Sequence, residues 1–148
     1  MLKFKHILIP TDGSATSARA ARAGVELARR LGARIIVYHA IDPVPHGFYA
    51  DGAPAGDYDK VQLERRARAA GQKHVEVIAR KARSAGVPCQ SLVEVAVPYE
   101  GIPAAARRRK CDAIFMGSHG HRGLKRLLLG SVASRVVATA DRPVIVYR

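Results

Sequence analysis

The stretch from Gly117 to Val132, GSHGHRGLKRLLLGSV, follows directly on an apolar run, AIFM, at residues 113–116. An apolar run that stops at a glycine is typical of a buried parallel strand ending at the carboxyl edge of its sheet. The stretch is basic and contains three further glycines, Gly120, Gly123 and Gly130, before Ser131 opens a helical pattern. Together these features predict a phosphate-binding arrangement, because glycines let the backbone come close and the first amides of a helix point at an anion.

Outward from this stretch, apolar runs alternate with helical patterns along the chain. Strands are predicted at residues 4–9, 34–40, 88–97, 113–116 and 143–147, and helices at 15–31, 60–85, 100–110 and from 131 onward. Ser14 is expected to cap the first helix and Gly32 to end it. At 148 residues the chain has the size of one domain. The alternation predicts a single α/β domain, residues 1–148, with an open parallel sheet and helices on both faces.

Residues Asp42 to Tyr58 differ from the rest, because they are rich in proline and glycine and show no periodicity. A long loop without secondary structure inside a compact domain is usually functional. This one would leave the carboxyl end of the second strand, which makes it a candidate lid. A loop without any role is the alternative, and the sequence does not decide between the two.

The glycine spacing excludes two common nucleotide motifs, since neither a Gly-Lys-Ser/Thr triplet nor a GxGxxG follows the strand. The observed spacing is G-x2-G-x9-G-S, formed by Gly117, Gly120, Gly130 and Ser131. This stretch closely resembles the ATP-binding universal stress proteins. The resemblance extends over nearly the whole chain, through KHILIPTDGS at 5–14, YHAID at 38–42, CDAIFMGSHG at 111–120 and RPVIVYR at 142–148.

The resemblance implies a five-stranded sheet of order 3-2-1-4-5, of the adenine-nucleotide α-hydrolase type. The first and fourth strands then lie side by side, and their connections leave toward opposite faces, so that a crevice opens between their carboxyl ends. One departure concerns Val97-Pro98-Tyr99, where the family commonly has a glycine turn before the third helix and this chain has none. The shape of that connection is therefore not predicted.

The resemblance also implies a set of residues that bind ATP, with Mg²⁺ as an accompanying ion. Pro10, Thr11 and Asp12 would line the adenine and ribose, Ala40 would face the adenine through its backbone, and Met116 and Gly117 would contact base and ribose. The phosphates would be held by Gly120, Gly130, Ser131 and Val132. From the residues alone, Asp12 has the alternative of an Asx-type turn, and the glycines that of plain loop glycines.

The function that this resemblance implies is a nucleotide-dependent regulator or switch in the stress response, acting through protein partners that the sequence does not identify. Two alternatives stay open: a basic interaction module for which the nucleotide is incidental, and a weak ATPase. Hydrolysis needs a group that orients water. The sequence offers no such residue, and we predict no catalytic residue.

The charge of the chain is +13, from 25 Lys and Arg against 12 Asp and Glu, which indicates anionic partners. The basic residues are spread over several predicted helices without interleaved aromatic residues, so we expect at most weak, sequence-independent nucleic-acid binding. No apolar stretch approaches the ~20 residues of a membrane span. No signal-peptide pattern is present either, and we expect a cytoplasmic protein that does not bind membranes.

Several single residues carry further predictions. Cys89 and Cys111 have no ligand-like neighbours and are expected to be free buried thiols. His119 and His121 lie on a glycine-flanked loop without a third ligand, so we expect exposed polar residues rather than a metal site. The strand at 143–147 would be a liability as an exposed edge. Family members commonly pair it about a two-fold axis, which implies a homodimer.

Overall fold

The computed structural model describes residues 2–43, 57–119 and 128–148 of the chain. Gly120, Gly123 and most of the predicted loop at 42–58 lie outside these ranges. The described elements, in chain order, are β1 (His6–Pro10), α1 (Ala15–Leu31), β2 (Arg34–Ile41), α2 (Asp57–Ser84), β3 (Cys89–Val95), α3 (Pro98–Arg108), β4 (Ala113–Gly117), α4 (Ser131–Thr139) and β5 (Val144–Tyr147).

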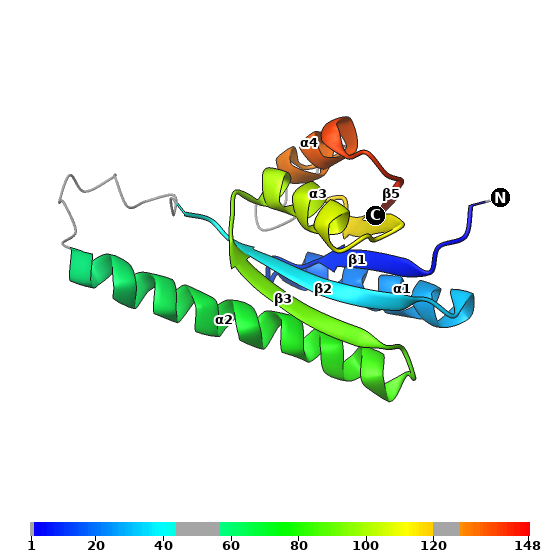
Figure 1. Ribbon diagram of the computed structural model, residues 1–148, viewed down its shortest axis with the longest axis horizontal. Helices are drawn as coiled ribbons and strands as arrows, with labels where there is room; N and C mark the ends of the chain where they lie inside the picture. The colour runs from blue at the N-terminus through cyan, green and yellow to red at the C-terminus, as the bar shows by residue number, and fades with distance from the viewer. Residues whose placement is uncertain (1, 44–56, 120–127) are drawn as a thin grey trace.

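The five strands form one parallel sheet in the order β3-β2-β1-β4-β5, which confirms the expected topology. Helices α1 and α2 cover one face of the sheet, and α3 and α4 cover the other (Figure 1). β1 and β4 are neighbours although they are far apart in sequence. Asp112, just before β4, reinforces their pairing, since its Oδ2 accepts the amides of Lys5 at 2.6 Å and His6 at 2.8 Å.

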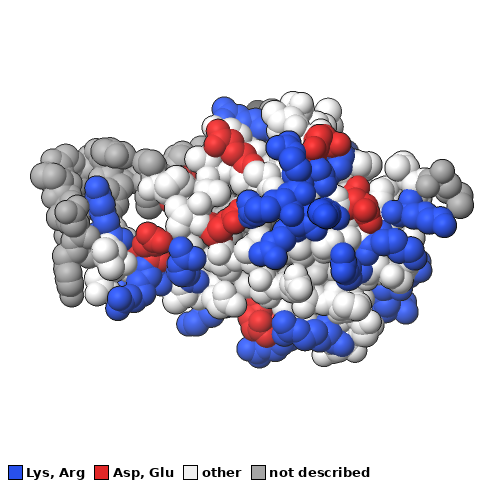
Figure 2. Space-filling view, viewed as in Figure 1, with Lys and Arg blue, Asp and Glu red and all other residues white. Residues whose placement is uncertain are grey.

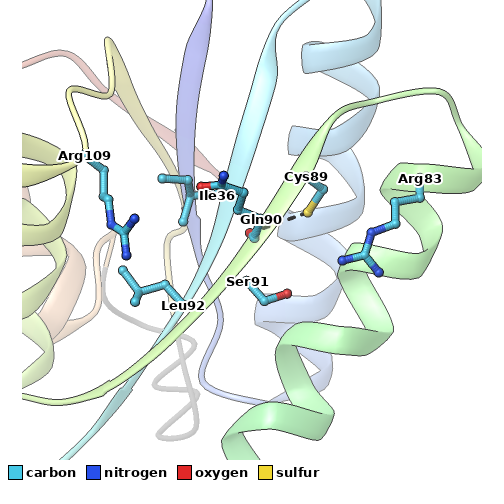
Figure 3. A pocket seen from close by; sticks show the side chains of 7 residues that line it. All are labelled: Ile36, Arg83, Cys89, Gln90, Ser91, Leu92 and Arg109. Atoms are coloured by element: carbon cyan, nitrogen blue, oxygen red, sulfur yellow. Dashed lines mark hydrogen bonds between the residues drawn. The ribbon is translucent and has the colours of Figure 1, made fainter.

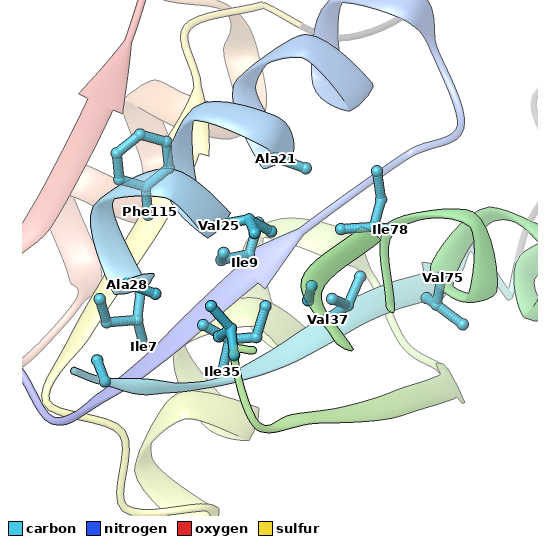
Figure 4. Packing of buried hydrophobic residues seen from close by; sticks show 13 residues of the cluster. Ile7, Ile9, Ala21, Val25, Ala28, Ile35, Val37, Val75, Ile78 and Phe115 are labelled. Atoms are coloured by element: carbon cyan, nitrogen blue, oxygen red, sulfur yellow. The ribbon is translucent and has the colours of Figure 1, made fainter. Parts of the chain in front are cut away.

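The alternation of side chains along the central strands creates two separate cores. In β1, Ile7 and Ile9 pack under α1 and α2, whereas Leu8 packs on the opposite face under α3 and α4. β2 repeats the pattern, and Figure 4 shows Ile35 and Val37 in the first of these cores with Phe115 of β4 nearby. Fully burying one such side chain contributes about 1.5–3 kcal/mol, so the central strands, which are buried on both faces, contribute strongly to the stability of the fold.

Several predicted boundaries differ from the structure by one to three residues, among them the starts of α2 and α3. Helix α2 begins at Asp57, so the last two residues of the predicted loop at 42–58 are helical. Helix α3 begins at Pro98, two residues earlier than predicted, with Val97 as its N-cap. Proline is well suited to the first helical position because the amide it lacks would have no intrahelical partner there. The missing glycine turn therefore corresponds to a direct passage from β3 into α3.

Basic side chains are spread over the surface, with one dense group near the middle of the face in Figure 2, about where α3 ends. Several are paired on their own helix, such as Arg29 and Arg30 with Glu26, both at 2.8 Å. Exposed pairs of this kind contribute only about 0–1 kcal/mol. None of the helices in the described ranges is long and apolar enough to cross a membrane.

The two cysteines are free, as predicted, but Cys111 is buried whereas Cys89 is only half-buried. Burial raises the pKa of the Cys111 thiol to about 11. Buried thiols with a raised pKa are poor nucleophiles. Within the part of the chain that the structure describes, no three His, Cys, Asp or Glu side chains come together as metal ligands.

Candidate functional site

The candidate site lies where β1 and β4 end at the carboxyl edge of the sheet. The two strands pair through Ile7 with Ala113 and Leu8 with Ile114. β1 leads into α1 on one face and β4 leads toward α4 on the other (Figure 1). In open α/β sheets, ligands bind at such a point, because the diverging connections leave a crevice between the strand ends.

The turn from β1 into α1 is closed by its own side chains. The amide of Ser14 donates to Asp12 Oδ1 at 2.9 Å, and the amide of Gly13 donates to Thr11 Oγ1 at 3.2 Å. Ser14 caps α1 as predicted, since its Oγ accepts the Ser17 amide at 3.1 Å. Asp12 therefore forms the Asx-type turn that was the alternative for it. Its role toward a ligand stays a prediction.

Two histidines, from β2 and α2, pack against this turn. His39 of β2 has Nδ1 2.8 Å from the carbonyl oxygen of Thr11, and its ring lies 5.5 Å from that of His74 of α2. Gly13 has φ of +83°, and a Cβ there would collide with the His74 imidazole. Glycine is thus required at this position both by the backbone and by the packing. The contact of His74 with this turn was not predicted, because a histidine within a long helical pattern gives no signal of it.

The end of β4 is built differently from the end of β1. Ser118 follows β4, and its amide donates to the Tyr147 carbonyl at 2.8 Å while its own carbonyl accepts the Gly130 amide at 2.6 Å. Gly130 is the N-cap of α4 and carries no side chain that could cap the helix. Within the described residues, the amides of Ser131, Val132 and Ala133 therefore have no acceptor, as the first amides of a helix lack intrahelical partners.

The two glycines described here are needed for close approach and not for unusual backbone angles. Gly130 has φ of −69° and ψ of 168°, which any residue adopts. A Cβ at Gly130 would lie 3.1 Å from the Ser118 carbonyl oxygen, and one at Gly117 would lie 3.2 Å from Ala20 Cβ. The backbone of Ser118 and His119 is what limits the space.

The structure brings most of the predicted residues to this edge. Pro10, Thr11 and Asp12 lie at the end of β1, Met116 and Gly117 at the end of β4, and Gly130, Ser131 and Val132 at the start of α4. Ala40 lies near the end of β2, and Gly120 lies outside the described residues. The Met116 side chain is buried in the core. Met116 and Val132, which also packs against that core, can thus offer a ligand mainly their backbone.

His119 is not the exposed residue that the sequence predicted. It is half-buried, its Nδ1 lies 3.0 Å from Ser118 Oγ, and its Nε2 is buried without a partner among the described residues. Ser118 itself is buried and was missed as a site residue. The signal that could have found both is their position between the end of the strand and the glycine loop.

Comparison with known proteins places the chain among curated relatives. It is 37% identical over 146 residues to a universal stress protein from Thermus aquaticus, an alignment that covers 98% of this chain and 99% of the relative. It is 34% identical over 146 residues to a universal stress protein of Methanocaldococcus jannaschii, covering 98% of this chain and 82% of the relative.

Solved structures share the fold. Universal stress protein UspA from Lactobacillus plantarum superposes with a TM-score of 0.84 at 22% identity, covering 99% of both chains. Two others were solved with nucleotides. One is a universal stress protein in complex with cAMP, with a TM-score of 0.63 at 22% identity, covering 99% of this chain and 98% of the other. The second, from Archaeoglobus fulgidus, is in complex with dAMP, with a TM-score of 0.64 at 22% identity and full coverage of both chains.

The model of the universal stress protein family matches residues 3–148, nearly the entire chain. Together with two relatives above 30% identity and a sheet of order β3-β2-β1-β4-β5, this match shows that the chain belongs to the universal stress protein family.

Proposed function

We propose that this protein binds ATP in the crevice between β1 and β4 and acts as a nucleotide-dependent regulator in the stress response. The phosphates would lie on the N-terminus of α4, and the base and ribose would lie toward the ends of β1 and β2. Adenine nucleotides in two structural neighbours support the class of ligand.

The observation that carries this proposal is the open N-terminus of α4. Three amides in succession, at Ser131, Val132 and Ala133, have no acceptor among the described residues. They lie near the neighbouring ends of β1 and β4, where the connections of the two strands leave toward opposite faces of the sheet. A helix terminus alone contributes only ~0.3–1 kcal/mol to an exposed charge. Affinity for a triphosphate therefore needs several amides that converge on it, and hydrogen bonds to charged groups contribute about 1.5–3 kcal/mol each.

The adenosine side of the proposal depends on Pro10, Thr11, Asp12, Ala40, Met116 and Gly117. Thr11 and Met116 are buried, so they would offer the base backbone groups and not their side chains. Asp12 uses Oδ1 in the turn. A carboxylate has further lone pairs, through which Asp12 would bind a ribose hydroxyl or the Mg²⁺ that accompanies ATP.

Calorimetry tests the proposal. Wild-type protein is titrated with ATP, GTP and inorganic triphosphate in the presence of Mg²⁺. We expect ATP to bind more tightly than GTP and triphosphate, because amides hold the phosphates and the strand ends select the base. No heat of binding at millimolar ATP would reject the proposal. Mass spectrometry of ligand released from denatured protein checks whether a nucleotide copurifies.

We further propose a homodimer through β5. This strand lies at the outer edge of the described sheet, its residues Val144, Ile145 and Val146 are half-buried, and Tyr147 is exposed. An apolar edge pairs readily with its own copy about a two-fold axis, because that contact closes on itself. Sedimentation should show a dimer, and deleting residues 144–148 should give a destabilised monomer. A monodisperse wild-type monomer at micromolar concentration would contradict this proposal.

A further inference from the structure

The opposite edge of the sheet is formed by β3, and arginines from the ends of α2 and α3 lie beside it. β3 pairs with β2 on one side, and no residue in the described ranges pairs with its other side. Edge strands normally carry devices that prevent unwanted pairing, since their free amides and carbonyls can template another strand. The side chains around β3 therefore indicate which kinds of strand can pair with this edge and which cannot.

The register shows which backbone groups of β3 are free. Ile35 donates to the Pro88 carbonyl at 2.8 Å, and Ala96 donates to the Ile41 carbonyl at 2.9 Å. In a parallel ladder the residues between these positions alternate in the side to which they hydrogen-bond. The even-numbered residues of β3 face β2, so Cys89, Ser91 and Val93 direct their amides and carbonyls away from the sheet.

Two arginines flank this free edge. Arg83 from the end of α2 and Arg109 from the end of α3 lie on opposite sides of β3 (Figure 3). Both line a hollow of about 430 Å³ that follows the first half of the strand, together with Ile36, Cys89, Gln90, Ser91 and Leu92. The free backbone groups thus lie between two guanidinium groups.

The arginines around β3 exceed the carboxylates. The Arg83 guanidinium bonds Glu76 at 3.0 Å and is half-exposed, and Arg108 bonds Glu94 at 2.7 Å. The Arg109 guanidinium has no hydrogen bond or ion pair with any described residue. Arg80 adds a fourth charge but shares Glu76, at 3.7 Å. The edge therefore has uncompensated positive charge, which carboxylates of a partner would neutralise.

We propose that the β3 edge binds an extended acidic segment of another protein as an added outer strand. Main-chain hydrogen bonds to Cys89, Ser91 and Val93 supply affinity, as in other strand-addition complexes. Successive side chains of a strand point to opposite faces. Two adjacent carboxylates in the segment would therefore meet Arg83 on one face and Arg109 on the other, each through charge-assisted hydrogen bonds.

A second copy of this chain does not fit the same edge. Pairing β3 with β3 through its first half, which Arg83 and Arg109 flank, would bring these arginines toward their own counterparts, and like charges across an interface are unfavourable. The charges that attract an acidic partner thus disfavour self-association through this half of the strand, so the occupant is a different chain. This proposal does not depend on nucleotide binding, because two strands, β2 and β1, lie between β3 and β4, whose end the α4 N-terminus approaches.

The test uses full-length protein and a fluorescein-labelled octapeptide of valine and threonine with two adjacent central glutamates. Fluorescence anisotropy should show micromolar binding. Arg83→Glu with Arg109→Glu should weaken it by about tenfold or more, because each substitution replaces an attraction with a repulsion. The matched control, Arg65→Glu with Arg66→Glu on the exposed start of α2, changes net charge equally and should weaken binding by about twofold at most.

Two further arms separate strand addition from plain charge attraction. Ser91→Pro removes an outward amide but no bond to β2, so it should weaken binding without lowering the melting temperature. A diglutamate peptide N-methylated at its central amides keeps its charges and should lose binding. In hydrogen exchange, the peptide should slow the amides of Ser91 and Val93 and leave Leu92 unchanged.

The outcomes that overturn the proposal are distinct. They are absence of diglutamate binding at millimolar concentration, equal binding of the N-methylated peptide, and equal losses from the Arg83/Arg109 and Arg65/Arg66 pairs. Calorimetry with ATP on the Arg83/Arg109 variant serves as a separate readout. Its result should match that of wild type, so failure of the β3 proposal and failure of the nucleotide proposal are distinguishable.

Discussion

Helices α1 and α4 both begin at the carboxyl edge of the sheet, yet their N-termini differ. At α1, the Oγ of Ser14 accepts the Ser17 amide of the first helical turn, and the oxygens of Thr11 and Asp12 accept the amides of Gly13 and Ser14 in the turn before the helix. At α4, the cap residue is Gly130, which contributes no side-chain oxygen. Both helices carry the same kind of dipole. They differ in whether a side chain of the cap residue accepts one of the first helical amides, as at α1, or accepts none, as at α4.

The comparison teaches how one sheet edge can combine a structural turn with a binding site. Capping of α1 fixes the end of β1, on one side of the candidate site. The missing cap of α4 costs helix stability, since a side-chain cap is worth typically ~1 kcal/mol. Gly130 forgoes this stabilisation next to the ends of β1 and β4. This choice favours ligand binding at the α4 N-terminus over the stability of the helix. Substitutions that give α4 a capping side chain, or that remove the capping side chain of α1, test this difference.

The largest effect is expected from giving α4 a cap. In Gly130→Asp the carboxylate would accept the free amides, as Ser14 does at α1, and would repel the phosphates. We expect ATP affinity to fall on the order of 100-fold, the value of about two lost charged hydrogen bonds offset by relaxation. Isothermal titration calorimetry measures this change.

Gly130→Ala is the matched control, because it adds the Cβ that lies 3.1 Å from the Ser118 carbonyl oxygen but no capping oxygen. We expect its loss of ATP affinity to be clearly smaller than that of Gly130→Asp. Equal losses in the two variants would mean that space, and not cap chemistry, governs the site. If Gly130→Asp bound ATP with wild-type affinity, the phosphates would not bind at the N-terminus of α4.

Removing the cap of α1 should instead reduce stability. Ser14→Ala deletes the oxygen that accepts the Ser17 amide at 3.1 Å, and we expect the free energy of unfolding to fall by ~1 kcal/mol. ATP affinity should change by less than about twofold, because no phosphate is expected at this helix. Urea denaturation measures the first quantity. If Ser14→Ala lost much of its ATP affinity and kept its stability, the N-terminus of α1, and not that of α4, would be the ligand-binding one.

Ser131→Ala probes the open terminus more gently. The hydroxyl is one donor among several, so we expect ATP affinity to weaken by a factor that corresponds to about 0.5–1.5 kcal/mol. The free energy of unfolding should stay within about 0.5 kcal/mol of wild type, because Ser131 is an exposed residue. Calorimetry and urea denaturation on the same preparation test both parts. A stability loss larger than the affinity loss would count against a ligand role.

The smallest effect is expected from Asp12→Asn. The amide oxygen of asparagine can still accept the Ser14 amide, so the turn and the stability should persist. ATP binding without Mg²⁺ should change by about twofold at most, whereas the gain in affinity on adding Mg²⁺ should shrink. The titrations are run with and without the metal. An unchanged Mg²⁺ effect would leave Asp12 as a turn residue alone.

The sequence allowed the fold to be predicted where local chemistry decides it. Apolar runs such as residues 113–116 predicted the strands, and Ser14 and Gly32 predicted the limits of α1. The strand order came from resemblance, because pairing of β1 with β4 is a long-range contact that no local pattern encodes. The start of α3 was predicted two residues late because the fit of Pro98 at the first helical position was not recognised, and no local pattern marks Asp57 as the start of α2.

For the candidate site, residue identities were predictable but their surroundings were not. The burial of His119 and Ser118 depends on the approach of α4 to the end of β4, and the role of His74 depends on the approach of α2 to Gly13. The basic edge at β3 also escaped the sequence, since Arg83 and Arg109 come from the ends of two different helices. Contacts between distant segments are set by the tertiary structure.

The pairing of β1 with β4 has a consequence for the order of folding. During synthesis, β1, β2 and β3 with α1 and α2 emerge first and can already form one layer of the protein. The bonds from Asp112 to Lys5 and His6 close a loop of more than 100 residues, and such long closures are slow steps. A crevice between β1 and β4 exists only after that closure. Bound ATP would therefore stabilise completed chains and leave partly synthesised ones without this support.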